Sequence, residues 1–156
     1  MDCNYANILI IKMKKIFYGR HNITDEDIAS VIEVLKSDNL TQGPKITEFE
    51  KNFAAYVGSK YAVAVSSGTA ALHLCTLATG INKGDKVITT PNTFVASANC
   101  VLYCGAEVVF SDIDNKTFLL DIEKVRKLLD SSPKGTYKAI IPVNFAGLPV
   151  NLDQYR

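Results

Sequence analysis

The chain has 156 residues, of which 47% are hydrophobic and 21% are charged, and this composition favours one soluble globular unit with a hydrophobic core. Its 17 basic and 16 acidic residues give a net charge of +1, which argues against a nucleic-acid-binding surface. The apolar run at residues 8–11 is too short to span a membrane.

The first residues and the cysteines indicate neither a targeting segment nor a metal site. We expect residues 1–15, which end in "KMKK", to be a disordered leader and not a signal peptide. The cysteines form no Cys-x-x-Cys pair and the chain has only 2 histidines, so no metal site is predicted. This cysteine usage favours a reduced, cytoplasmic setting.

Two amphipathic helices are predicted before residue 59. Thr24 is a plausible N-cap of the first helix, "SDNLTQGP" breaks the pattern, and Gly58 ends the second helix. Their apolar positions follow helical spacing: Ile28, Val31, Ile32 and Leu35 in the first helix, and Phe49, Phe53, Tyr56 and Val57 in the second.

Strands and helices alternate after these two helices. Short apolar runs predict strands at residues 61–67, 85–90, 106–114 and 137–145. Helices are predicted between the strands at residues 68–80, 93–105 and 121–132. The order β-α-β-α-β-α-β is typical of an α/β fold with a parallel sheet covered by helices.

Parallel sheets of this kind bind ligands in the loops that follow the carboxyl ends of their strands. The candidate site loops are therefore residues 66–69, 90–94, 111–114 and 143–148. No other part of the predicted fold is favoured as a ligand site by this reasoning.

The sequence "SSGT", residues 66–69, joins the first predicted strand to a helix. The first N–H groups of a helix lack partners within it and lie at the positive end of its dipole, so they attract phosphate. Gly68 would expose the backbone, and Ser66, Ser67 and Thr69 would add hydroxyl groups. A simple helix cap explains the same residues, and no Walker A or Gly-x-Gly-x-x-Gly motif is present, so both interpretations stay open.

Phe94, in "TTPNTFVAS", follows the next predicted strand at the same edge of the sheet. An aromatic side chain there could stack on a flat heteroaromatic ligand, and a core phenylalanine is the alternative. A phosphate site and an aromatic ring on neighbouring loops together indicate a phosphorylated aromatic cofactor.

Three stretches, "SSGTAALHL", "PNTFVASANCVLYCGAEVVFSDID" and "KAIIPVNFAG", resemble the sugar-nucleotide aminotransferases of the DegT/DnrJ/EryC1/StrS family. The resemblance extends from Phe17 to Arg156. Within the family, "FYGRHNI" and "LTQGPKITEFE" are most similar to a branch of transaminases that act in pseudaminic acid biosynthesis.

The resemblance implies a homodimeric enzyme of fold type I that depends on pyridoxal 5'-phosphate. It would move an amino group from glutamate to a keto-sugar linked to UDP. Residues 16–45 would form an N-terminal segment with a helix, and residues 46–156 an incomplete cofactor-binding large domain with a mainly parallel sheet.

The resemblance also implies roles for individual residues. By motif match, Ser67, Gly68 and Thr69 would bind the cofactor phosphate. Phe94 would stack on the pyridine ring of the cofactor. The residues in segments similar to those that line the sugar-nucleotide pocket are Tyr18, Thr41 and Gln42. Many relatives have histidine at the position of Asn144, and we expect this difference to tune cofactor binding without abolishing it.

No catalytic residue is predicted within the chain. In this family the Schiff-base lysine and the acidic partner of the pyridine nitrogen lie further along than Arg156. The lysines that we expect to be solvated surface charges are Lys83, Lys86, Lys124, Lys127 and Lys138. We therefore expect the N-terminal part of an aminotransferase, inactive by itself.

Two alternatives remain open from the sequence. A family relative could use the same cofactor for sugar deoxygenation, with histidine in place of the lysine, and only downstream sequence separates the two. A non-catalytic cofactor-binding remnant that ends at Arg156 is the other alternative.

Overall fold

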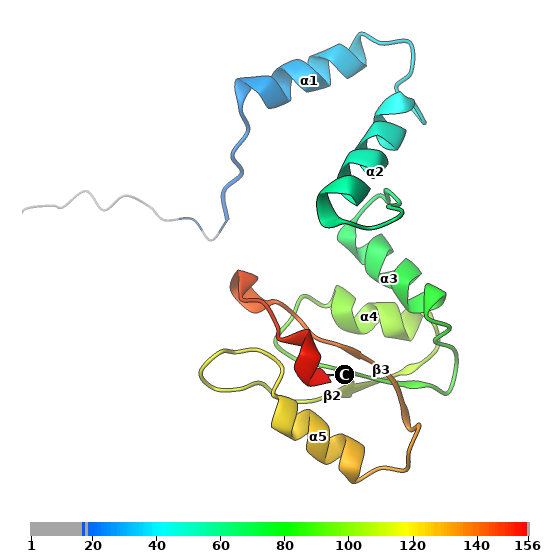
Figure 1. The fold of residues 1–156 in the computed structure, drawn as a ribbon, viewed down its shortest axis with the longest axis vertical. Helices are drawn as coiled ribbons and strands as arrows, with labels where there is room; N and C mark the ends of the chain where they lie inside the picture. The colour runs from blue at the N-terminus through cyan, green and yellow to red at the C-terminus, as the bar shows by residue number, and fades with distance from the viewer. Residues whose placement is uncertain (1–16, 18, 156) are drawn as a thin grey trace, which may run out of the picture. The chain divides into compact units, whose positions relative to one another are not determined.

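The computed structural model describes residue 17 and residues 19–155. The chain divides after Ala62 into two compact units, and each is described by itself. The first unit contains the helices α1 and α2, and the second contains the sheet and the remaining helices (Figure 1).

The first unit confirms both predicted amphipathic helices. In α1 (Asp25–Leu35), the Thr24 hydroxyl accepts from the backbone N–H of Asp27 at 3.3 Å, and the Asp27 carboxylate accepts from the backbone N–H of Thr24 at 2.8 Å. This reciprocal pair is a capping box. The second helix, α2 (Pro44–Val57), begins at a proline and ends at Gly58, whose φ of 69° suits a glycine cap.

The second unit is built on a parallel sheet of three strands in the order β2-β1-β3. The strands are β1 (Lys86–Thr89), β2 (Glu107–Phe110) and β3 (Tyr137–Ile141), and Val87 of the central strand is paired with Val108 and Ala139. The helices are α3 (Gly68–Ala78), α4 (Ala96–Tyr103) and α5 (Ile122–Asp130). Two short 3-10 helices follow, η1 (Phe145–Gly147) and η2 (Leu152–Tyr155). The predicted α/β class with a parallel sheet is confirmed.

The strand predicted at residues 61–67 is wrong for this structure. These residues form no strand, and the side chains of Tyr61 and Val63 are 74% and 77% exposed. The apolar pattern correctly indicates residues suited to a buried strand, but a strand also needs a neighbour for its N–H and C=O groups. None of the three strands in residues 19–155 pairs with this segment.

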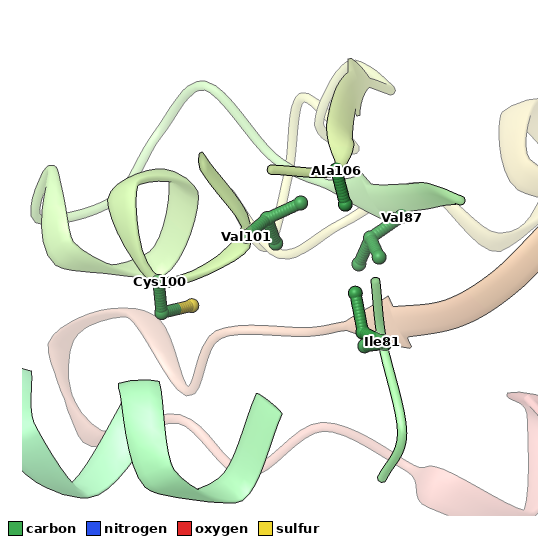
Figure 2. Packing of buried hydrophobic residues seen from close by; sticks show 5 residues of the cluster. All are labelled: Ile81, Val87, Cys100, Val101 and Ala106. Atoms are coloured by element: carbon green, nitrogen blue, oxygen red, sulfur yellow. The ribbon is translucent and has the colours of Figure 1, made fainter. Parts of the chain in front are cut away.

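Two small hydrophobic clusters cover the two faces of the sheet. Successive residues of a strand point to opposite faces, and Val87 and Ile88 of β1 accordingly belong to different clusters. On one face, Val87 contacts the group shown in Figure 2, which comprises Ile81, Cys100, Val101 and Ala106. On the other face, Ile88 contacts Leu120 and Val125. Helices α4 and α5 therefore lie on opposite sides of the sheet (Figure 1).

We expect the Ile88→Ala substitution to destabilise the second unit by roughly 2–5 kcal/mol, because it removes a fully buried side chain from the central strand. The free energy of unfolding from urea titrations followed by circular dichroism measures the effect. Ile28→Ala is the matched control, since Ile28 is 49% exposed on α1. Equal losses for the two variants would contradict the assignment of the core.

Candidate functional site

The carboxyl ends of the three parallel strands lie at one edge of the sheet, and each is followed by a loop of the second unit. The loop after β1 covers residues 90–95, the loop after β2 covers residues 111–121, and the loop after β3 begins at residue 142. The separate loop before α3 ends in Ser66 and Ser67, the first two residues of "SSGT", and α3 packs against α4.

Ser67, Gly68 and Thr69 form the start of α3. Ser67 is the N-cap, with φ −165° and ψ 163°, and its hydroxyl oxygen accepts from the backbone N–H of Ala70 at 3.2 Å. The capping interpretation is thus confirmed for Ser67. Gly68 and Thr69 are the first two helical residues, and their N–H groups precede the first hydrogen bond within the helix.

The surroundings of Gly68 fit a phosphate group. A Cβ atom at Gly68 would meet no atom within 4 Å, so the side-chain position of this glycine faces open space. The positive end of the α3 dipole and the backbone N–H groups of Gly68 and Thr69 supply the donors that a phosphate requires. Phosphate binding by these residues stays a prediction.

Phe94 is not a core residue, because its side chain is 74% exposed. The loop that carries it is held on both sides: Thr90 is 1% exposed, and the Thr93 and Ser97 hydroxyl oxygens are 2.8 Å apart. The exposed ring is accessible to a ligand. That it faces the same ligand as Gly68 stays a prediction.

Thr41 and Gln42 lie in the turn between α1 and α2, and both are exposed. Gln42 has φ 51°, a left-handed conformation that asparagine or glycine adopts more readily than glutamine. Tyr18 lies outside the described residues. A sugar-nucleotide pocket formed by these three residues stays a prediction.

Asn144 shapes the loop after β3. Its side-chain oxygen Oδ1 accepts from the backbone N–H of Val150 at 2.9 Å. The loop that this bond closes contains Ala146 with φ 51°, another left-handed residue that is not glycine. Asn144 therefore fixes backbone at the carboxyl edge of the sheet.

Two of the five lysines that we expected to be surface charges form ion pairs. Lys86 Nζ lies 3.2 Å from Glu107 Oε1, and Lys124 Nζ lies 2.8 Å from Asp112 Oδ2. The hydrogen bond to Asp112 raises the pKa of Lys124 above 10.5. A Schiff base forms from a neutral amine, so this environment opposes that chemistry at Lys124. Within residues 17 and 19–155, no group of His, Cys, Asp and Glu side chains could hold a metal ion.

Three residues at the carboxyl edge were not identified from the sequence: Asn92, Phe118 and Phe145. Asn92 Nδ2 donates to the backbone oxygen of Phe118 at 3.3 Å, and the Phe118 and Phe145 rings are 6.3 Å apart. Only the turn around Asp114 had a recognisable signal, because an aspartate followed by polar residues favours a turn. None of these long-range contacts has a signature in a single sequence.

The second unit has an α/β fold with a parallel sheet, a class in which ligands bind in the loops at the carboxyl edge of the sheet. Residues 21–156 match the DegT/DnrJ/EryC1/StrS aminotransferase family, and the chain belongs to that family. The family resemblance of the sequence is therefore confirmed. No helix within residues 19–155 is long and apolar enough to cross a membrane.

Similar proteins extend well beyond the matched region. The spore coat polysaccharide biosynthesis protein SpsC of Bacillus subtilis (strain 168) is 47% identical over 136 residues, which are 87% of this chain and 34% of SpsC. Helicobacter pylori PseC, an aminotransferase involved in the biosynthesis of pseudoaminic acid, has a TM-score of 0.78 and 34% identity, over 90% of this chain and 37% of PseC.

A further similar structure is known with different forms of a cofactor. A Streptococcus pneumoniae protein solved in a PLP-form and a PMP-form has a TM-score of 0.76 and 32% identity, over 86% of this chain and 33% of that protein. The chain thus spans about a third of the length of these relatives.

We expect Asp114 to titrate below pH 3.8, because the backbone N–H of Thr117, and then its hydroxyl, hold the pKa of Asp114 below that ordinary value. The lowered pKa means that the carboxylate stabilises the folded turn above the unfolded-state pKa. That contribution is lost as the pH falls through the folded-state pKa.

Carbon-13 NMR of the Asp114 carboxyl group measures this titration. Thr117→Ala removes the hydroxyl donor and keeps the backbone N–H, so it should raise the midpoint without bringing it to 3.8. A midpoint at or above 3.8 in the unmodified chain would contradict the hydrogen-bonded turn.

Proposed function

We propose that this chain supplies the phosphate- and ring-binding part of a pyridoxal 5'-phosphate-dependent aminotransferase. The enzyme would move an amino group from glutamate to a keto-sugar linked to UDP, as a homodimer. Membership of the aminotransferase family supports the reaction class, and the PLP-form of the Streptococcus pneumoniae relative supports the cofactor. The observation that carries the proposal is the open, capped start of α3.

The start of α3 would hold the phosphate of the cofactor. Ser67 caps the helix through Ala70 and so keeps the N–H groups of Gly68 and Thr69 directed out of the helix start. Gly68 lets a phosphate oxygen approach the backbone, and the Thr69 hydroxyl can donate a further hydrogen bond. These contacts bind and orient the cofactor through its phosphate.

Phe94 would hold the ring of the cofactor, because its exposed side chain follows the central strand. When bound, pyridoxal 5'-phosphate supplies the electron sink that amino-group transfer requires. Phe94 contributes a flat apolar surface that excludes water from one ring face. Asn144 would contribute by fixing the neighbouring loop.

Binding of the cofactor by this chain would be non-covalent. The hydrogen bond to Asp112 favours the protonated side chain of Lys124, and the family's Schiff-base lysine has no counterpart in the motifs present. We infer that the chain by itself does not catalyse transamination.

The substrate that we favour is the UDP-linked keto-sugar that accepts the amino group in the reaction of UDP-4-amino-4,6-dideoxy-N-acetyl-β-L-altrosamine transaminase. The similarity to PseC, whose pathway makes pseudoaminic acid, supports this choice. Tyr18, Thr41 and Gln42 would line the sugar-nucleotide pocket, and the exposed turn between α1 and α2 leaves Thr41 and Gln42 accessible.

Binding of pyridoxine 5'-phosphate and of unphosphorylated pyridoxine tests the phosphate site, since neither forms a Schiff base with surface lysines. We expect Gly68→Asp to reduce the preference for the phosphorylated ligand by about two- to thirtyfold, because it opposes anion binding at the helix start. The new acid favours the helix itself, so folding should be retained. Isothermal titration calorimetry measures both affinities.

The matched control is Gly19→Asp, which changes the net charge equally at an open position in the other unit. An unchanged preference in Gly68→Asp, or the same loss in Gly19→Asp, would contradict a phosphate site at α3.

A further inference from the structure

Three loops at the carboxyl edge of the sheet are joined by direct contacts that the cofactor proposal does not use. The Asn92 side chain, after β1, donates through Nδ2 to the backbone oxygen of Phe118 at 3.3 Å. The Phe118 ring, in the connection from β2 to α5, contacts the Phe145 ring after β3, with centroids 6.3 Å apart and planes tilted by 48°. Phe118 thus lies between the other two loops.

Phe118 has an unusual backbone conformation. Its φ is 60°, in the left-handed region that bulky residues rarely adopt. The surrounding turn imposes this conformation: the N–H of Phe118 donates to Asp114 O at 2.9 Å, and an antiparallel bridge joins Ile113 to Leu120 on either side. Strained residues that are held in this way concentrate at functional sites, so the outlier justifies a search for a role.

The position of Phe94 depends on the hydrogen bonds of its own loop. The ring is 74% exposed, so packing against other side chains does not hold it. The N–H of Asn92 donates to Thr90 Oγ1 at 3.2 Å, and Thr93 bonds with Ser97. The bond from Asn92 to Phe118 joins this loop to a different part of the chain, 26 residues away.

We propose that Phe118 is a positioning residue for the ring-binding side of the site. Its left-handed backbone turns its carbonyl oxygen towards Asn92, and this hydrogen bond fixes the loop that presents Phe94. The Phe145 contact holds the Phe118 side chain in place. The role in ligand binding rests on the proposed function, whereas the fixing of the loop is independent of it.

Hydrogen exchange of the amides in residues 90–95 of the full chain tests the fixed loop directly. Asn92→Asp is nearly isosteric and removes the donor, so exchange in this segment should accelerate roughly two- to tenfold, as expected for one lost hydrogen bond. The amides of β1 should keep their protection. Asn115→Asp makes the same chemical change in an exposed residue of the Phe118 loop and should leave residues 90–95 unchanged.

Two substitutions of Phe118 distinguish the role of its backbone conformation from that of its ring. Glycine adopts positive φ readily, so Phe118→Gly should largely keep the protection of residues 90–95. Valine is β-branched and resists this conformation, so Phe118→Val should lose that protection. Equal loss in both variants would overturn the role of the Phe118 carbonyl, and so would an unchanged segment in Asn92→Asp.

Ligand affinities test the link to the site. Asn92→Ala, which removes the donor without adding a charge, should weaken the binding of pyridoxine and of pyridoxine 5'-phosphate by the same factor, because it disturbs the ring platform and leaves the phosphate preference intact. A loss of affinity for the phosphorylated ligand alone would contradict the proposal that Asn92 and Phe118 act through Phe94. If the unmodified chain binds neither ligand, the proposed function fails and the link to it fails as well, while the exchange data still decide whether Phe118 fixes the loop.

Discussion

The central strand β1 is the constraint on which the second unit depends. Its parallel pairing with both neighbours sends three chain segments out at one edge of the sheet. Val87 and Ile88 are fully buried on opposite faces, and the Thr89 hydroxyl donates to the backbone oxygen of Ile141 at 2.8 Å. Because the strand is held on its faces and both its edges, the loops that follow have a fixed base.

Ligand binding by this unit would depend on the groups that its loops and the start of α3 expose. The start of α3 offers backbone donors and open space at Gly68, and the loop after β1 offers the exposed ring of Phe94. Both groups suit a phosphorylated aromatic ligand, and the family to which the chain belongs consists of aminotransferases. The contacts of Phe118 add a physical reason for an exposed ring to keep one position.

Local patterns in the sequence predicted the parts of the fold that depend on local interactions. Thr24 and Gly58 mark helix ends because capping involves neighbouring residues, and the apolar run around Val87 predicted the buried strand β1. The segment around Val63 was predicted as a strand, but strand formation also depends on a distant partner. The left-handed Phe118 could not be predicted, since an aspartate indicates the turn but not which residue takes a positive φ, and the bond from Asn92 is a tertiary feature.

Nitrogen-15 NMR of the labelled chain during titration with inorganic phosphate tests the central claim most directly. The account predicts that the backbone amides of Gly68 and Thr69 shift most and saturate together, since they are the first donors of α3. Shifts centred on the surface lysines of α5, with the Gly68 and Thr69 amides unmoved, would contradict a phosphate site at this helix.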